Sequence, residues 1–94
     1  MSYKLKFKTV ALKEWKKLDR TIQLQFKKKL SERLKAPHVE SAALRQLPNC
    51  YKIKLKNAGY RLVYQVHDKE IVVEVIAVGK RERNHAYKTA MKRL

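Results

Sequence analysis

Alternating lysines between residues 52 and 56 are the feature of this chain that could most directly do chemistry. Lys52, Lys54 and Lys56 lie two residues apart, so in a β-strand all three side chains would point to one face of a sheet. Cations on one face repel each other and lower the pKa of a lysine, which can then act as a general base. The row indicates either a strand face that is simply solvated or a binding site for an anionic ligand.

Further candidates follow this row in the second half of the chain. Arg61 comes just after a predicted turn at 57–59, and a basic run follows a predicted strand at 71–78. A meander would bring these segments into one part of a sheet, although the register that decides whether Arg61 shares the lysine face stays open. The candidate functional residues of these segments are Arg61, Lys80, Arg81, Arg83 and Tyr87.

Such a cationic cluster suits RNA better than sequence-specific DNA, because no helix-turn-helix, basic zipper or zinc finger is recognisable. RNA carries its own nucleophile, the 2′-hydroxyl. Its cleavage needs a base, in-line geometry, positive charge near the phosphate and a proton for the leaving group. Lysine and arginine are poor acid–base groups near neutral pH, so something else must position the substrate. Tyr60, Tyr64 and Tyr87 interleave with the cations and could stack on exposed bases.

Motifs of other enzyme classes are absent from the sequence. It has no glycine-rich phosphate loop, no HExxH motif and no nucleophile elbow, and its 8 acidic residues are too scattered for a two-metal nuclease. His38, His67 and His85 are widely spaced, which is typical of surface side chains rather than metal ligands. The single Cys50 excludes an intramolecular disulfide and a cysteine-based zinc site, and we interpret it as a small filler. We therefore expect no metal and no cofactor.

Composition indicates one small basic domain. The 94 residues include 24 Lys and Arg against 8 Asp and Glu, a net charge of +16, and 45% of them are hydrophobic. That hydrophobic share is typical of a folded chain, so we expect one domain over residues 1–94. The charge predicts a polyanionic partner, which could be nucleic acid, an anionic membrane surface or an acidic protein. No stretch is apolar enough for a membrane span, no signal peptide is recognisable, and one cysteine suits a cytoplasmic protein.

Hydrophobic periodicity predicts an N-terminal strand and a helical hairpin. Residues 3–7 alternate between apolar and charged side chains, as a half-buried strand does. Two amphipathic helices follow, the second capped by Asp19 or Thr21 and ended by Pro37. Their apolar stripes are Leu12, Trp15 and Leu18 in the first helix, and Ile22, Phe26, Leu30 and Leu34 in the second.

The second half of the chain predicts three strands and a last helix. Strands at 51–56 and 60–67 are joined by a turn in which Gly59 takes a positive φ, and the β-branched run 71–78 is typical of a strand buried on both faces. Asn84 is a candidate cap for the last helix. The order β-α-α-β-β-β-α predicts an α+β fold, with the helices packed on one face of a mainly antiparallel sheet.

Segments along the whole chain resemble the RelE toxin family of bacterial RelBE toxin–antitoxin systems. The resemblance implies a fold shared with microbial ribonucleases of the barnase type: an N-terminal strand, a helical hairpin on a mainly antiparallel sheet, and a C-terminal helix. The matching segments are 11–15, 27–30, 47–48, 50–55, 59–66 and 78–83, together with Tyr87.

The resemblance also implies an activity, that of a ribosome-dependent endoribonuclease. Such an mRNA interferase cuts mRNA in the ribosomal A site by 2′-hydroxyl attack, leaves a 2′,3′-cyclic phosphate and inhibits translation. By the resemblance, Lys52 is the general base, Lys54 stabilises the transition state and Arg61 clamps the phosphate. Arg81 is then the general acid, and Tyr87 stacks on or orients the substrate. The residues expected to contact RNA are Arg45, Lys56, Lys80 and Arg83.

The partners implied by the resemblance are the ribosome with its rRNA, mRNA, and a RelB-like antitoxin. The antitoxin would neutralise the toxin, and it carries the operator-binding domain, so that operator DNA is reached only through the complex. Its binding would displace the last helix, where Tyr87 lies. No membrane partner is expected. Two other functions stay open: a non-catalytic basic RNA- or ribosome-binding module, and an interaction domain whose charge holds an acidic partner.

Overall fold

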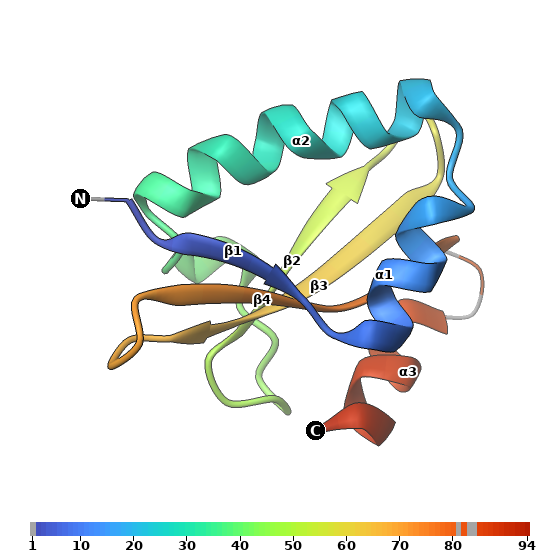
Figure 1. Cartoon of the computed structure of the whole chain (residues 1–94). Helices are drawn as coiled ribbons and strands as arrows, with labels where there is room; N and C mark the ends of the chain where they lie inside the picture. Colours follow the sequence, from blue (N-terminus) through green and yellow to red (C-terminus); the bar gives the residue numbers. More distant parts are fainter. Residues whose placement is uncertain (1, 81, 83–84) are drawn as a thin grey trace.

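Strands and helices follow one another in the predicted order (Figure 1). The computed structural model describes residues 2–80, 82 and 85–94, so the predicted cap Asn84 lies outside the described residues. The observed order confirms the α+β class. The elements are β1 (Lys4–Phe7), α1 (Thr9–Lys16), α2 (Arg20–Lys35), the 3₁₀ helix η1 (Glu40–Ala42), β2 (Cys50–Leu55), β3 (Tyr60–His67), β4 (Val72–Lys80) and α3 (His85–Arg93).

The sheet has four strands in the order β1-β4-β3-β2. β2, β3 and β4 form the predicted antiparallel meander, while β1 pairs with β4 in parallel, Lys4 opposite Val72 and Phe7 opposite Val75. The sheet is therefore mainly antiparallel, as predicted. β4 lies between β1 and β3 (Figure 1). Its side chains are buried on both faces, because residues 72–78 are almost all β-branched or small.

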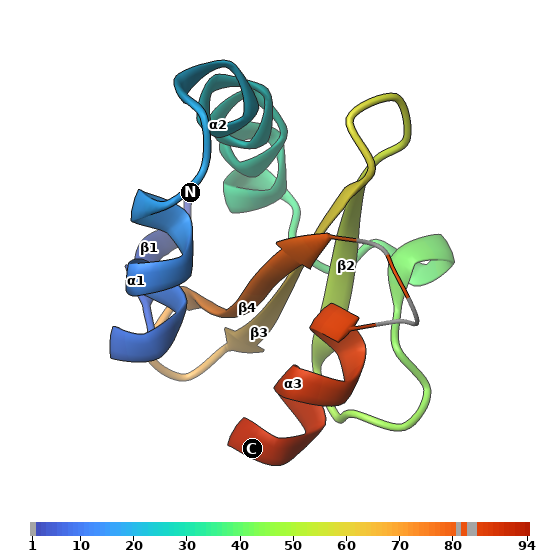
Figure 2. The ribbon, with the colours of Figure 1, turned by 90° about the vertical axis from the view of Figure 1, so that its right-hand side faces the viewer.

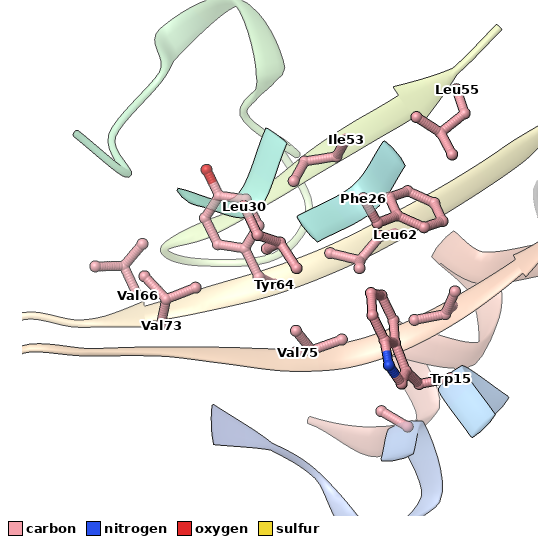
Figure 3. Packing of buried hydrophobic residues seen from close by; sticks show 12 residues of the cluster. Trp15, Phe26, Leu30, Ile53, Leu55, Leu62, Tyr64, Val66, Val73 and Val75 are labelled. Carbon is pink, nitrogen blue, oxygen red and sulfur yellow. The ribbon is translucent and has the colours of Figure 1, made fainter. Parts of the chain in front are cut away.

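α1 and α2 cover one face of the sheet (Figure 2), as the helical hairpin predicted. Their apolar stripes meet the side chains that the strands project toward them (Figure 3). α2 ends at Lys35, two residues before Pro37, because a residue preceding proline disfavours the helical conformation. The buried residues of this main core are Ala11, Trp15, Phe26, Leu30, Ile53, Leu55, Leu62, Tyr64, Val66, Val73, Val75 and Val78.

α3 covers the opposite face of the sheet, so the prediction that the helices share one face is wrong for this helix (Figure 2). Ala86 and Ala90 of α3 are buried with Val63, Ile76 and Ala77 in a second, smaller core. These strand residues point away from α1 and α2, and without a helical cover they would lie in water. None of the described helices is long and apolar enough to cross a bilayer.

Two apolar residues depart from the predicted pattern. Leu5 of β1 is 37% exposed, although Tyr3 and Phe7 on either side of it pack against the main core. Ile71, predicted as the first residue of a strand, lies instead in the turn before β4 with φ 57°, a conformation that β-branched residues rarely adopt. Gly59 has φ 73°, which confirms its predicted role in the turn between β2 and β3.

Candidate active site

The register of the β2–β3 hairpin places Lys54 directly opposite Arg61. Lys52 lies opposite Val63, and Lys56 follows β2 in the turn. Cross-strand partners project from the same face of a sheet, so Arg61 shares the face of the lysine row. The structure thus settles the register that the sequence left open. It brings three predicted site residues, Lys52, Lys54 and Arg61, onto the face that α3 covers.

α3 adds an aromatic ring to these cations. The guanidinium carbon of Arg61 lies 5.0 Å from the centre of the Tyr87 ring, within the range of a cation–π contact. The Tyr87 hydroxyl is buried, and among the described residues it has no hydrogen-bond partner. Burial raises the pKa of Tyr87, while the charge of Arg61 acts in the opposite direction. The site therefore combines cations of the sheet with a neutral phenol ring of α3.

The pKa of Lys54, the middle lysine of the row, is shifted by its neighbours. Its pKa is lowered from the ordinary lysine value, first by the charge of Lys52, then by desolvation and by the charge of Arg61. A hydrogen bond with Lys52 and the charge of Lys56 act in the same direction. The effect predicted for neighbouring cations therefore falls on the middle lysine, which the resemblance assigned to charge stabilisation rather than to proton transfer.

Three of the other predicted RNA-contacting cations each line a pocket on the surface. Lys56 is exposed in the β2–β3 turn, where it lines a groove of about 380 Å³ together with Lys29 of α2. Lys80 is exposed at the end of β4 and lines a pocket of about 620 Å³ with residues of α3. Arg45 lies in the loop before β2 and lines a pocket of about 210 Å³ with Tyr87. Two further predicted site residues lie outside the described residues: Arg81 and Arg83.

Two of the tyrosines proposed to stack on bases belong to the main core instead. Tyr64 is 0% exposed; its hydroxyl donates to the carbonyl oxygen of Pro37 at 2.7 Å. Tyr60 packs against the same core, since neighbouring residues of a strand point to opposite faces and Arg61 takes the other one. The stacking prediction is therefore wrong for Tyr64, which has no exposed surface, whereas Tyr60 is partly buried. Of these three tyrosines, Tyr87 lies on the cationic face.

Arg33 supports the strand that carries the lysine row, and it was not among the residues predicted from the sequence. Its Nη1 donates to the Lys52 carbonyl oxygen at 3.1 Å and to the Tyr64 hydroxyl at 2.9 Å. These bonds tie α2 to the backbone that carries the lysine row. The available signal was its spacing: Arg33 comes three residues after Leu30 of the apolar stripe, so its side chain begins on the buried side of the helix.

Cys50 is a buried structural residue and not a nucleophile. Its side chain is 1% exposed in the second core, and burial raises the pKa of its thiol to about 11. A thiol with this pKa stays protonated near neutral pH, so the interpretation as a filler agrees with the structure. His67 lies outside the site as well, its Nε2 3.0 Å from an oxygen of Glu74.

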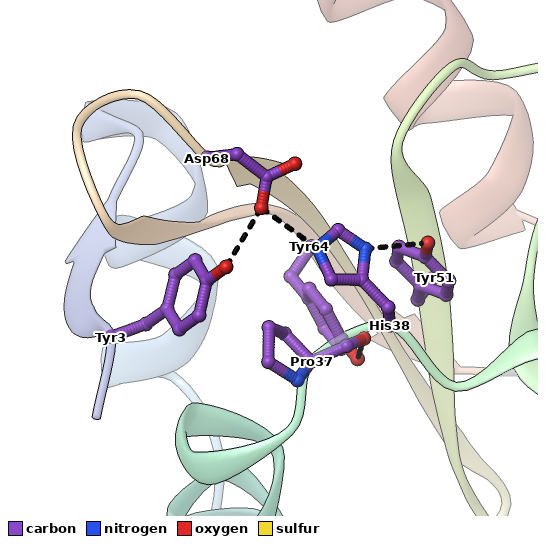
Figure 4. Close-up of polar contacts among 6 residues, drawn as sticks. All are labelled: Tyr3, Pro37, His38, Tyr51, Tyr64 and Asp68. Atoms are coloured by element: carbon purple, nitrogen blue, oxygen red, sulfur yellow. Dashed lines mark hydrogen bonds and ion pairs between the residues drawn. The ribbon is translucent and has the colours of Figure 1, made fainter. Parts of the chain in front are cut away.

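His38 belongs to a polar network beside the β3–β4 turn (Figure 4). Its Nε2 lies 2.7 Å from Oδ1 of Asp68, and its Nδ1 lies 3.0 Å from the hydroxyl of Tyr51. The Tyr3 hydroxyl donates to the same Asp68 oxygen at 2.7 Å. These bonds connect the N-terminal segment, β2 and the β3–β4 turn. Nowhere in the described part of the chain do three or more His, Cys, Asp or Glu side chains gather as metal ligands would.

Known proteins resemble this chain over its whole length. Residues 5–85 match the family described as ParE toxin of type II toxin-antitoxin system, parDE. The mRNA interferase toxin RelE of Escherichia coli (strain K12) and the mRNA interferase RelE of Shigella flexneri are each 56% identical to it over 94 residues. Each match covers 100% of this chain and 99% of the relative.

Solved structures agree with these sequence matches. The R81A/R83A mutant of E. coli toxin RelE in the free state has a TM-score of 0.92 and 54% identity, covering 100% of this chain and 99% of that one. The same mutant in complex with an antitoxin RelBc peptide has a TM-score of 0.84, with the same identity and coverage. This chain therefore belongs to the ParE toxin family of type II toxin–antitoxin systems, and its relatives within that family include RelE toxins.

Proposed function

We propose that this chain is a metal-independent endoribonuclease, an mRNA interferase that cleaves mRNA in the ribosomal A site. The observation that carries the proposal is the grouping of Lys54, Arg61 and Tyr87, which offers two cations to a phosphate beside a ring on which a base can stack. Relatives from E. coli and Shigella flexneri, 56% identical over 94 residues, bear the name mRNA interferase, which supports the same activity here.

The proposed reaction is a transesterification within the RNA strand. The 2′-oxygen attacks the neighbouring phosphorus, the bond to the 5′-oxygen breaks, and a 2′,3′-cyclic phosphate and a 5′-hydroxyl result. Lys52 accepts the proton of the 2′-hydroxyl, and Lys54 and Arg61 stabilise the charge that develops on the phosphate oxygens. Tyr87 orients the base. Arg81 returns a proton to the 5′-oxygen, a role that rests on the family resemblance alone.

Dependence on the ribosome follows from the chemistry of this site. Lysine and arginine transfer protons inefficiently near neutral pH, so cleavage needs a substrate that another body holds in line. Exposed lysines on α1 and at its end, and on α2, offer a surface for rRNA, and we expect the activity in the cytoplasm with the translating ribosome. These lysines are Lys13, Lys16, Lys17, Lys27, Lys28 and Lys29.

Neutralisation by an acidic, RelB-like antitoxin is the second part of the proposal. A toxin with a net charge of +16 attracts an acidic partner, and the structure of E. coli RelE with a RelBc peptide supports a partner of this kind. We expect the antitoxin to displace α3 and carry Tyr87 away from Arg61, and to supply the operator-binding domain. An unchanged Tyr87 position in a structure of the complex would contradict this inhibition mechanism.

Primer extension on stalled ribosomes tests the activity. Ribosomes carrying a defined mRNA are incubated with the wild-type chain or with Arg61→Ala, and the new 3′ ends are mapped. We expect wild-type cuts within the A-site codon and a rate at least about a hundredfold lower for Arg61→Ala, because one transition-state cation is lost. Lys27→Ala, which removes a charge from α2, is the matched control and should mainly change the salt dependence, by about one unit of slope.

Binding without cleavage distinguishes the non-catalytic alternative. A basic ribosome-binding module would sediment with ribosomes and leave the mRNA intact. For an enzyme, Arg61→Ala or Arg81→Ala should weaken cleavage far more than ribosome binding. Equal losses of cleavage and binding would favour the module.

A further inference from the structure

α3 is attached to the sheet by two small buried residues and by Tyr87, which packs partly buried against the second core. Ala86 and Ala90 are its buried residues, whereas Met91 is 47% exposed and Leu94, just after the helix, is 48% exposed. Alanine methyl groups bury little apolar surface, and at its C-terminal end α3 is held by the polar contacts of Arg93. This attachment matters because α3 carries Tyr87.

Arg93, the last residue of α3, forms a bidentate ion pair with Glu14 of α1. Nη1 donates to Oε1 of Glu14 at 2.8 Å, and Nη2 donates to Oε2 at 3.1 Å. The side chains of Arg93 and Glu14 are only 19% and 25% exposed, so water screens this pair less than a pair on the open surface. The pair joins helices on opposite faces of the sheet.

The same two side chains bind backbone groups at an edge of β4. β1 pairs with β4 only as far as Val75. Just beyond, the carbonyl oxygen of Ile76 accepts a hydrogen bond from Nη1 of Arg93 at 2.7 Å, and the amide of Val78 donates to Oε1 of Glu14 at 3.2 Å. The ion pair therefore takes the place of a neighbouring strand here, and it connects α1, β4 and α3 at one point.

We propose that Glu14 is a positioning residue of the ribonuclease site, acting through Arg93 and α3 on Tyr87. Tyr87 and Arg93 lie on one helix within about two turns of 3.6 residues, so a helix tethered at Arg93 keeps the Tyr87 ring at its 5.0 Å from Arg61. Loss of the tether lets α3 shift or fray, and the ring leaves the cation. This inference rests on the proposed function, because it deepens the role of Tyr87 in RNA cleavage.

Glu14→Gln tests the tether with little change of shape. The amide keeps one acceptor oxygen, but its nitrogen replaces an acceptor of Arg93 and the charge is lost. On stalled ribosomes we expect kcat to fall about tenfold, while KM for the ribosome–mRNA complex stays within about twofold. Hydrogen exchange of the α3 amides should become about tenfold faster. Glu70→Gln, which removes a charge from the exposed β3–β4 turn, is the matched control and should change neither kcat nor the exchange of the α3 amides.

A double-mutant cycle with Tyr87→Ala separates positioning from general destabilisation. If Glu14 acts through Tyr87, adding Glu14→Gln to Tyr87→Ala changes kcat by less than about twofold. Arg93→Lys keeps a donor and the charge, so its kcat should lie between those of the wild type and of Arg93→Met. A further tenfold loss in the Tyr87→Ala background would overturn the proposal, and so would wild-type kcat together with wild-type α3 exchange in Glu14→Gln. An inactive wild-type chain would instead contradict the proposed function, and exchange of α3, which needs no ribosome, would still test the tether.

Discussion

Lys54 and Arg61 are direct cross-strand partners, so two cations occupy a pair position at which β-sheets favour opposite charges. The arrangement opposes folding, and in the proposed function the phosphate of the RNA substrate compensates it by binding between the two side chains. Stability and activity should therefore respond in opposite directions to substitutions of this pair.

Replacing Lys54 by glutamine tests this opposition. Lys54→Gln should raise the free energy of unfolding, because a like-charge pair is removed. Its cleavage rate on stalled ribosomes should fall at least about tenfold. Urea unfolding and primer extension measure the two effects. Lys69→Gln in the exposed β3–β4 turn is the control, and a Lys54→Gln variant less stable than the wild type would contradict the explanation.

The pH dependence of cleavage should show whether Lys54 acts as a cation or as a base. Its lowered pKa means that the ammonium loses its proton at a lower pH than an ordinary lysine. A stabilising cation then makes the rate fall on the alkaline side of the profile, through this lowered pKa. Lys54→Arg stays charged, so we expect it to keep about a third or more of the neutral rate and to lose the alkaline fall. Abolished cleavage in Lys54→Arg would identify Lys54, and not Lys52, as the base.

Removing the Tyr87 hydroxyl should stabilise the chain. The oxygen is buried without a described partner, so Tyr87→Phe should raise the free energy of unfolding by about 1 kcal/mol. The ring stays beside Arg61, and cleavage should remain within about threefold of the wild type, whereas Tyr87→Ala should lose more than about tenfold. Calorimetry measures the stability of the two variants, and single-turnover cleavage measures their activity. Equal activity losses in both variants would show that the hydroxyl itself contacts the RNA.

Ile71 offers a stabilising substitution away from the site. Its φ of 57° is unfavourable for a β-branched side chain, and the residue is 41% exposed. Asparagine adopts this conformation more readily, so Ile71→Asn should raise the free energy of unfolding by about 1 kcal/mol. Ile71→Val keeps the branched Cβ and should not stabilise. Urea unfolding of the two variants provides the test.

Asp68 should make stability depend on acid pH. Hydrogen bonds from Tyr3 and then from His38 lower the pKa of Asp68 from its ordinary value of 3.8. A carboxyl group with a lowered pKa in the folded state contributes stability above its unfolded pKa, and that contribution is lost as the pH falls through the folded pKa. Asp68→Asn should therefore flatten the dependence of Tm on pH below about pH 4. An unchanged acid slope would show that the network contributes nothing.

Much of the fold was predictable because single strands and helices carry their own periodicity. Lysines that alternate with Ile53 and Leu55 identify a half-buried strand whatever lies beside it. The face covered by α3 was not predictable, because Ala86 and Ala90 are small enough to pack on either side of a sheet. The register of β2 and β3 was not predictable either. Whether Lys54 lies opposite Arg61 depends on the geometry of the hairpin turn rather than on either strand alone.

Contacts between distant parts of the chain were the other limit. The candidate cations of the site were identifiable from residue type and spacing. Spacing places the Arg33 side chain toward the buried side of α2, but no local pattern indicates its bond to the Lys52 carbonyl oxygen, 19 positions along the chain. No local pattern connects Glu14 with Arg93, which pair only after the whole sheet has formed between them.

Two contacts join the ends of the chain and constrain the order of its folding. β1 pairs with β4 through Lys4 and Val72, and Glu14 binds Arg93, 79 positions later in the sequence. Both contacts join residues that are made far apart in time during synthesis, and contacts of this long range slow folding. A nascent chain therefore lacks the Glu14–Arg93 pair, which we propose positions Tyr87 beside Arg61, until residue 93 has been made. If the chain cleaves mRNA as we propose, the ribosome that makes it does not meet a finished site before these contacts form.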